Sequence, residues 1–218
     1  MNILTKEEDY TEWRYLWPPR PERAVPKAMI PFFQRQGWSA NVKKNGTCSI
    51  IGRCDDKVIR SATRHDEPHK AWQADYNSPA LRALKRLPNQ WFVFEAEVLH
   101  SKGNGLRDFV CIFDILVANN KTCDGMTWSQ RMSLLYQLFP EAKESRVFTG
   151  LDMIDERLSI IRPLINVDFL EVFESLTNGE DEGLVLKDPN SVLAPCYHPS
   201  SNADWQIKCR KPTKNYGH

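Results

Sequence analysis

Four strand-like runs of this sequence carry polar or aromatic side chains two residues apart. Side chains at positions i and i+2 of a β-strand point to the same face, so each set occupies one surface. Strand faces rich in glutamate and lysine normally point to solvent, but dense apolar sequence flanks these runs. The pattern therefore indicates a cleft lined by amines, carboxylates and aromatic rings, and the spacing alone does not say which reaction it performs. The sets are Asn41 with Lys43, Glu95 with Glu97, Phe109 with Cys111 and Phe113, and Lys208 with Arg210.

Short strands make up most of the elements that must position these side chains. Residues 38–43 and 47–53 have the composition of strands, and Asn45–Gly46 between them predicts a β-hairpin. Because strands outnumber helices and most neighbours look antiparallel, the expected fold class is α+β rather than alternating βαβ. Further strands are expected at 57–63, 91–100, 109–117, 182–187 and 204–211.

Helices are expected in three places. Ser78 followed by Pro79 predicts the N-cap and first residue of one helix. Thr127 predicts the N-cap of a second helix. A third helical segment is expected to end near Asn178–Gly179, a pair that favours the left-handed conformation at helix ends.

The Pro- and Arg-rich stretch at residues 17–23 cannot lie inside a helix, because proline removes backbone donors and fixes φ. Residues 1–27 are therefore interpreted as an extended N-terminal arm packed on the surface. Residues 28–218 are expected to form one domain.

The composition of the 218 residues is that of a globular chain, with 41% hydrophobic and 26% charged residues. No run of about 18 uncharged apolar residues exists, and the acidic start MNILTKEEDY has no apolar segment, so neither a membrane span nor a secretory signal is expected. The six cysteines form no C-x-x-C pair and are interpreted as reduced thiols of a cytoplasmic protein. The net charge of +1 excludes a polycation, so a nucleic-acid partner requires cations concentrated on one face.

Six short motifs follow one another between residues 41 and 210. They are Lys43-Lys44-Asn45-Gly46, Thr63-Arg64, Glu95-Ala96-Glu97, Phe113-Asp114-Ile115, the EGLVLK run at 182–187, and Trp205 with Lys208-Cys209-Arg210. This ordered set resembles the motifs of the covalent nucleotidyltransferase superfamily: ATP-dependent DNA ligases, RNA ligases and mRNA capping enzymes. The resemblance covers nearly the whole chain. It implies the family's adenylation fold, with antiparallel sheets flanked by helices and ATP in a cleft between the sheets.

Each motif has a simpler explanation when it is taken alone. Phe113 by itself would be a core residue, and Arg64 a surface residue. Glu182 would belong to a turn, and Lys208 with Arg210 to an exposed strand edge. Their joint occurrence in the family's order favours the functional interpretation.

The resemblance makes Lys43 the nucleophile that attacks the α-phosphate of ATP. Its spacing to Gly46 selects Lys43 over Lys44, which is expected to be solvated. A lysine amine attacks only when it is neutral, and nearby cations such as Lys208, Arg210 and a bound metal favour the neutral form. The implied product is a covalent lysyl-AMP, with pyrophosphate as the leaving group.

The resemblance also implies the ligands of the metal and the nucleotide. Mg²⁺, or Mn²⁺ in its place, prefers oxygen ligands and retains waters, so Glu182 is its first candidate ligand and Glu97 its second. Glu97 is alternatively a ribose ligand. The other nucleotide-binding candidates are Asn41 for the adenine edge, Phe113 for the adenine face, Arg64 for a phosphate or the ribose, Lys187 for the AMP phosphate, and Lys208 with Arg210 for the phosphoryl oxygens.

The implied function is an ATP-dependent polynucleotide ligase that seals 5′-phosphate/3′-hydroxyl nicks, with DNA favoured. AMP passes from the lysine to the 5′-phosphate, and the 3′-hydroxyl then displaces it. A cytoplasmic monomer for DNA repair, replication or recombination is expected, with a virus-encoded enzyme acting in a host cytoplasm as the alternative. The alternative functions are an ATP-dependent RNA ligase, a GTP-using mRNA capping enzyme and an inactive nucleic-acid-binding relative.

Three positions depart from the family's pattern. Asn41 stands where many DNA ligases have glutamate, Cys48 stands where they often have arginine, and Arg210 replaces the usual second lysine. Only seven residues follow Lys211, so no OB-fold domain is expected. That expectation predicts salt-sensitive substrate binding, or a partner protein that clamps the duplex.

Overall fold

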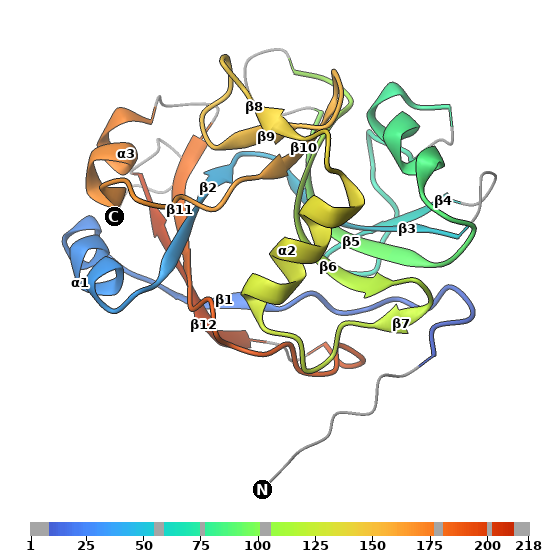
Figure 1. Ribbon diagram of the computed structural model, residues 1–218, viewed down its shortest axis with the longest axis horizontal. Helices are drawn as coiled ribbons and strands as arrows, with labels where there is room; N and C mark the ends of the chain where they lie inside the picture. The colour runs from blue at the N-terminus through green and yellow to red at the C-terminus, as the bar shows by residue number, and fades with distance from the viewer. Residues whose placement is uncertain are drawn as a thin grey trace, which may run out of the picture.

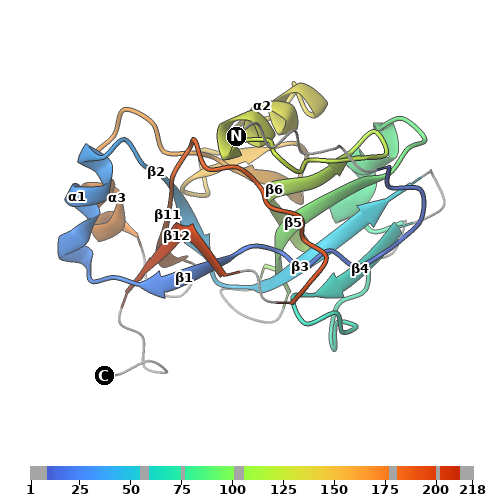
Figure 2. The same cartoon turned by 90° about the horizontal axis from the view of Figure 1, so that it is seen from below.

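The structure of the protein is a computed structural model that describes residues 9–54, 59–74, 77–100, 106–176, 181–199 and 202–211. Two β-sheets form its two halves, and helices pack on their outer sides (Figure 1, Figure 2). The expected α+β class is confirmed. Within the described ranges, no helix is long and apolar enough to cross a membrane.

The smaller sheet has four strands in the order β1-β12-β11-β2. β11 is antiparallel to both of its neighbours, whereas β1 runs parallel to β12. This parallel pair brings the N-terminal stretch alongside the last strand. The strands are β1 (Arg20–Ala24), β2 (Ser39–Lys44), β11 (Asp181–Lys187) and β12 (Asn202–Arg210).

The larger sheet has eight strands, in the order β4-β3-β5-β6-β10-β9-β8 with β7 paired to β6. All of its pairs are antiparallel except β10 with β6. The strands expected from the sequence are present in the two sheets, with ends that differ by one or two residues. The strands are β3 (Thr47–Arg53), β4 (Ile59–Thr63), β5 (Phe92–Leu99), β6 (Phe109–Ala118), β7 (Lys121–Thr122), β8 (Lys143–Glu144), β9 (Leu151–Met153) and β10 (Leu158–Ile161).

The helix predicted after Thr127 is confirmed as α2 (Trp128–Leu138). Its first turn has a capping box, in which the Thr127 and Gln130 side chains each bond the other residue's backbone N–H. α3 (Phe169–Ser175) begins at Asp168, whose carboxylate caps it. The predicted helix end at Asn178–Gly179 lies outside the described residues.

The helix predicted after Ser78 is a 3₁₀ helix, η2 (Pro79–Arg86), rather than an α-helix. Ser78 is the N-cap residue and Pro79 the first helical residue, as predicted, but the Ser78 side chain does not bond the helix backbone. Its Oγ instead donates to Asp108 Oδ1 at 2.8 Å. Two short elements that the sequence did not predict, η1 (Lys27–Met29) and α1 (Ile30–Arg35), precede β2.

The predicted hairpin at Asn45–Gly46 is also wrong. β2 and β3 follow each other there but belong to different sheets, so the chain crosses from the smaller sheet to the larger one. Gly46 passes so close to β5 that an added Cβ atom would lie 2.5 Å from Val98 O. The glycine is needed for this close approach rather than for a tight turn.

The alternation of side chains gives the smaller sheet one apolar face and one polar face. The apolar face packs against α1 and α3 in a core of its own. The other face is left free to line the space between the two sheets. The buried residues of the apolar face are Ala40, Val42, Leu184, Leu186, Ile207 and Cys209.

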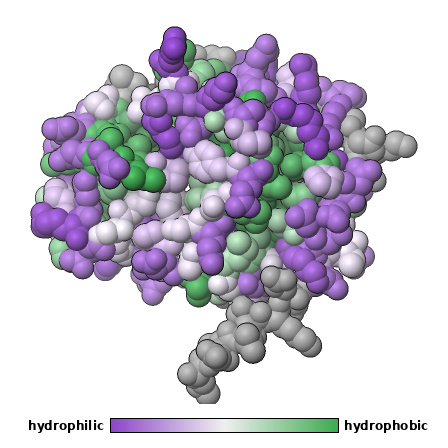
Figure 3. Space-filling model, in the orientation of Figure 1, coloured by the Kyte–Doolittle hydropathy of each residue, from purple (hydrophilic) through white to green (hydrophobic). Residues whose placement is uncertain are grey.

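A second core lies against the larger sheet and includes η2 and α2. On the outside of the molecule, Figure 3 shows hydrophilic side chains over most of one face, with small apolar areas between them. None of the six cysteines forms a disulfide, and Cys48 and Cys54 are the two that are not fully buried.

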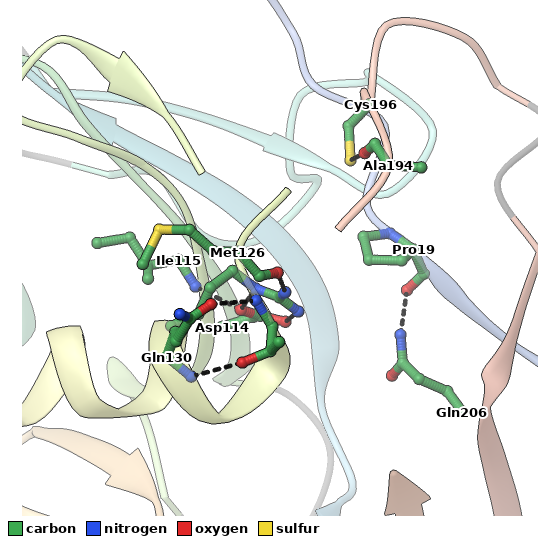
Figure 4. Close-up of polar contacts among 10 residues, drawn as sticks. Pro19, Asp114, Ile115, Met126, Gln130, Ala194, Cys196 and Gln206 are labelled. Atoms are coloured by element: carbon green, nitrogen blue, oxygen red, sulfur yellow. Dashed lines mark hydrogen bonds and ion pairs between the residues drawn. The ribbon is translucent and has the colours of Figure 1, made fainter. Parts of the chain in front are cut away.

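The described part of the N-terminal arm is packed more deeply than a surface arm. Tyr10 and Leu16 are buried in the core of the larger sheet. Tyr15 Oη donates to Thr63 O at 2.8 Å, and Gln206 Nε2 donates to Pro19 O at 3.2 Å (Figure 4). The arm therefore ties the end of β4 in one sheet to β12 in the other.

Candidate active site

A cavity of about 780 Å³ lies between the two sheets, and every site residue predicted from the sequence lines it. The volume lies within the range of small-molecule binding sites. Both sheets supply lining residues, so the expected cleft between sheets is present. From the smaller sheet come Asn41, Lys43, Glu182, Lys187, Lys208 and Arg210, and from the larger sheet and the turn after β4 come Glu97, Phe113 and Arg64.

Lys43 and Glu182 form an ion pair across the neighbouring strands β2 and β11, between Nζ and Oε2. The two side chains are 19% and 20% exposed, so a ligand in the cavity can reach both. Arg210 Nε lies 3.6 Å from the same carboxylate oxygen. One carboxylate thus stands between the predicted nucleophile and a predicted phosphate-binding cation.

A β-bulge turns Glu182 toward the cavity. Gly183 is paired with Lys43, and Asp181 rather than Glu182 is paired with Lys44, so Glu182 is the extra residue of β11. Gly183 has φ +133°, and an added Cβ atom would lie 2.1 Å from Cys209 O. A bulge that re-aims one side chain is common beside active sites.

Lys44 is not solvated, contrary to expectation. Its side chain is 4% exposed and lies on the opposite face of β2 from Lys43. Its Nζ donates to Asp181 Oδ1 at 2.7 Å and to Thr149 O at 2.8 Å. A buried lysine requires such partners, and these contacts fix β2 against β11.

The remaining cations gather around Lys208. Partial burial lowers the pKa of Lys208, and the positive charges of Arg210, Lys43 and Arg64 lower it further, in that order. Four cations thus face one space, which favours a ligand that carries several negative charges.

Phe113 lies where β6 bulges. Glu95 is paired with Asp114, and Ala96 with Ile112, so Phe113 is the extra residue of its strand. Lys187 Nζ lies 5.3 Å from the centre of the Phe113 ring. The structure thus places Lys187 beside the predicted adenine-stacking ring.

Lys187 is 2% exposed and belongs to a buried group of charges that the sequence did not predict. Burial lowers its pKa, although the negative charges of Asp114 and Glu95 oppose that change. Burial, and then the charge of Asp114, raises the pKa of Glu95 to about 8. Arg131 forms a bidentate ion pair with Asp114. Asp114 Oδ1 also accepts a hydrogen bond from the Ile115 N–H (Figure 4).

Glu97 is the second predicted metal ligand. Its Oε1 accepts a hydrogen bond of 3.0 Å from the Gly46 amide, which fixes the carboxylate beside the crossing between the sheets. Among the residues that the structure describes, no cluster of three or more His, Cys, Asp or Glu side chains could hold a metal. Two carboxylates in an open cavity nevertheless fit Mg²⁺ or Mn²⁺, because such ions complete their coordination with waters and substrate phosphates.

Asn41 is 3% exposed and shares the cavity face of β2 with Lys43. Its Nδ2 donates to Ile161 O at 3.1 Å. Its Oδ1 is buried and has no hydrogen-bond partner among the described residues. A buried acceptor without a partner is uncommon and is suited to a ligand that brings a donor.

Further lining residues were not predicted as site residues. They come from the N-terminal arm, from the segment after Arg64 and from β3. Burial, followed by the charges of Glu95 and Glu97, raises the pKa of Cys48 well above its ordinary value, so its thiol is unreactive. The one signal in the sequence was the Pro- and Arg-rich stretch of the arm, where Arg20 or Arg23 could contact nucleic acid, although a packed surface arm was the preferred interpretation. These residues include Pro18, Arg20, His65, His69 and Cys48.

Comparison with solved structures identifies the fold. A mycobacterial DNA ligase D complexed with ATP and MES is 19% identical at a TM-score of 0.53, with 79% of this chain and 54% of that chain covered. The ligase domain of M. tuberculosis LigD is 20% identical at a TM-score of 0.53, with 79% and 53% covered. The chain has the fold of a ligase domain.

The ligase fold extends over almost all of the chain. Pmar-Lig_PreS3 matches 90% of this chain and 47% of its own length, at 12% identity and a TM-score of 0.58. The chain thus spans about half the length of the ligase structures that it matches. No family model and no curated protein matches the sequence. The expectation of a nucleotidyltransferase-type fold is confirmed.

Proposed function

We propose that the protein is an ATP-dependent polynucleotide ligase that forms a covalent adenylate on Lys43. The observation that carries this proposal is the ion pair of Lys43 with Glu182 in a cavity that also holds Lys208, Arg210 and Arg64. A nucleophilic amine, a carboxylate and several cations are the groups that phosphoryl transfer requires. The ligase fold of the chain supports the same assignment.

The first step is the attack of the Lys43 amine on the α-phosphorus of ATP. The Nζ–P bond forms while the bond from the α-phosphorus to the bridging oxygen breaks, and pyrophosphate leaves. The amine must first lose a proton, because an ammonium paired with Glu182 has no lone pair to donate. Lys208 and Arg210 neutralise the charge that spreads over the phosphoryl oxygens.

Adenine is the base that the lining favours. Asn41 Oδ1 accepts a hydrogen bond from the exocyclic amine of adenine. Guanine has a 6-oxo group at that position, which cannot donate a hydrogen bond to Asn41 Oδ1. Phe113 covers one face of the base, and Val185 of β11 lines the cavity as well. Glu97 holds the ribose or shares the metal, and Arg64 and Lys187 complete the nucleotide contacts.

Glu182 is the first metal ligand in this proposal, with Glu97 as the second. These two carboxylates would hold Mg²⁺ or Mn²⁺, and the ion would neutralise negative charge on the phosphates.

The substrate of the later steps is a nicked duplex, with DNA favoured because the matched ligase D structures belong to DNA ligases. The 5′-phosphate oxygen attacks the lysyl-AMP phosphorus, which breaks the Nζ–P bond. The 3′-hydroxyl then attacks the activated 5′-phosphate, loses its proton and releases AMP. Roles in DNA repair, replication or recombination, a cytoplasmic location and a clamping partner protein belong to the same proposal.

Covalent labelling tests the first step. The protein is incubated with ATP or GTP labelled at the α-phosphate, in the presence of Mg²⁺, and separated on a denaturing gel. Label from ATP that disappears in Lys43→Ala but persists in the exposed-lysine control Lys27→Ala is the expected result. Equal labelling of Lys43→Ala contradicts the proposal. Labelling by GTP alone identifies a capping-type enzyme, and duplex binding without any label identifies an inactive relative.

A strand-resolved sealing assay tests the substrate. Nicked duplexes carry DNA or RNA on each side of the break, and sealed product is measured for each of the four combinations. The DNA proposal requires sealing of the all-DNA nick. Sealing that needs RNA on either side assigns the protein to the RNA ligases instead.

A further inference from the structure

Arg20 opens β1 and lines the same cavity as the proposed nucleophile, although no sequence motif assigns it a role. Its Nη2 donates to Arg64 O at 2.9 Å. β1 is the edge strand of the smaller sheet and β4, which Arg64 follows, is the edge strand of the larger one. The hydrogen bond therefore joins the two sheets at one edge of the cleft.

Most N–H donors of the Arg20 guanidinium are not used in hydrogen bonds to the described residues. A guanidinium carries five N–H donors, and the bond to Arg64 O is the one hydrogen bond that Arg20 makes from its side chain to described residues. Its Nε is buried without a partner. In the described part of the chain, no carboxylate pairs with Arg20, Arg64 or Lys208. Cations gathered without acidic partners form a site for an anion.

The backbone that carries Arg20 is held along β12 of the smaller sheet. β1 is bonded along β12, with Arg20 paired with Asn202 and Ala24 with Lys208. Just before β1, Pro19 O accepts the hydrogen bond from Gln206 Nε2. A side chain on a strand fixed in this way is positioned before the ligand binds, which lowers the entropic cost of binding.

The cations form a series that leads away from the nucleophile. Lys208 is close enough to Lys43, Arg210 and Arg64 for their charges to act on it, and Arg64 in turn contacts Arg20. An anion bound near Lys43 can therefore extend past Lys208 to the edge of the cleft. In both proposed reactions, the attacking group and the leaving group lie on opposite sides of the α-phosphorus. The group that is exchanged with Lys43 therefore lies on the side of the α-phosphate that faces away from Lys43.

We propose that Arg20, together with Arg64, binds the phosphate group that lies beyond the α-phosphate, away from Lys43. In the first step this group is the pyrophosphate of ATP, and in the second it is the 5′-phosphate of the nicked strand. The inference rests on the proposed ligase function and adds a binding residue from outside its motifs.

Two pairs of ligands test the inference, and within each pair one ligand lacks the group that Arg20 is proposed to bind: the pyrophosphate or the 5′-phosphate. ATP is compared with AMP for binding to the Lys43→Ala protein, which prevents covalent reaction. A nicked duplex with a 5′-phosphate is compared with one that has a 5′-hydroxyl for binding to the parent protein. Arg20→Ala is expected to reduce the preference for ATP over AMP and for the 5′-phosphate nick by roughly 10- to 100-fold each. Affinity for AMP and for the 5′-hydroxyl nick is expected to stay within about twofold.

Arg23→Ala is the matched control, because Arg23 is an exposed arginine of the same strand that does not line the cavity. Arg20→Gln keeps an amide donor for Arg64 O but removes the charge. If Arg20→Ala lowers the melting temperature, the same binding comparison is made with Arg20→Gln instead. Loss of the ATP preference alone identifies pyrophosphate as the ligand, and loss of the 5′-phosphate preference alone identifies the nicked strand. Unchanged preferences, or an equal loss in Arg23→Ala, overturn the inference. A parent protein that takes no label from ATP refutes the ligase proposal instead.

Discussion

Asp114 and Arg131 form a bidentate ion pair between β6 and α2 that is almost completely buried. Arg131 Nε donates to Oδ1 at 2.7 Å and Nη2 donates to Oδ2 at 2.8 Å, and the side chains are 0% and 1% exposed. Arg131 Nη1 also donates to Met126 O at 2.9 Å. Asp114 is paired with Glu95 across the sheet, so this ion pair supports the wall of the cavity.

Removal of one partner of this pair is expected to be strongly destabilising. Arg131→Met leaves the Asp114 carboxylate buried without its cation, which costs about 3–5 kcal/mol. The control substitution Arg86→Met breaks the exposed pair with Glu141 and is expected to cost about 0–1 kcal/mol. Urea unfolding of both variants measures the difference. Similar losses in the two variants would show that burial adds nothing to the Asp114 pair.

Asn41 is expected to determine the preference for adenine. Asn41→Ala removes the Oδ1 acceptor, so affinity for ATP falls by roughly tenfold while the weaker affinity for GTP stays unchanged. Ser39→Ala is the control, because Ser39 is on the same face of β2 but does not line the cavity. Nucleotide titration in the Lys43→Ala background checks the prediction. An equal loss for both nucleotides would exclude a contact to the base edge.

The sequence predicted the strands and the residues of the cavity well, because both depend on local patterns. Alternation placed Lys208 and Arg210 on the face opposite Ile207 and Cys209, and the structure buries the latter two. The order of the family motifs along the chain identified which polar residues to group together. The strands that carry these residues were predicted from the local sequence around each motif.

What could not be predicted depends on contacts between distant segments. Alternation alone groups Glu182 with Leu184 on the buried face, and only the bulge at Gly183 turns it toward Lys43. Lys44 is buried because Asp181 lies opposite it, which no local pattern reveals. Asn45–Gly46 looks like a hairpin because the crossing between two sheets uses the same small residues as a turn.

The elevated pKa of Glu95 predicts a pH-dependent stability. Burial and the charge of Asp114 raise it from 4.5 to about 8, so between these values the folded protein holds a proton that the unfolded chain has released. The stability contributed by Glu95 is therefore complete below pH 4.5 and is lost as the pH rises through 8. Glu95→Gln imitates the protonated form and is expected to lack this loss.

Urea unfolding at about pH 5 and pH 9 measures this effect. The free energy of unfolding of Glu95→Gln, minus that of the parent protein, is expected to be larger at about pH 9 than at about pH 5, because only the parent loses stability as the pH rises. Glu144→Gln is the control, since ion pairing with Arg162 lowers the pKa of that exposed carboxyl and it stays ionised throughout. A constant difference between Glu95→Gln and the parent at both pH values would contradict a protonated Glu95.

The bulge at Gly183 is expected to be required for both stability and adenylation. Gly183→Ala places a Cβ atom 2.1 Å from Cys209 O, at a φ of +133° that side chains other than hydrogen rarely allow. Relief of this clash moves β11 away from β12 and displaces Glu182 from Lys43. We expect a loss of about 1–3 kcal/mol in the free energy of unfolding. Because the proposed metal ligand Glu182 moves with the backbone, labelling by ATP is expected to fall by roughly 100-fold even where the protein remains folded.

Gly37→Asn separates this effect from the general cost of replacing a left-handed glycine. Gly37 has φ +78° and no atom within 4 Å of an added Cβ, and asparagine tolerates that conformation better than other residues. Its stability and labelling are expected to match those of the parent protein. Chemical unfolding and the labelling gel, run on both variants at a temperature where each is folded, distinguish the outcomes. Full labelling of folded Gly183→Ala would show that Glu182 reaches Lys43 without the bulge, and the role assigned to the extra residue of β11 would be wrong.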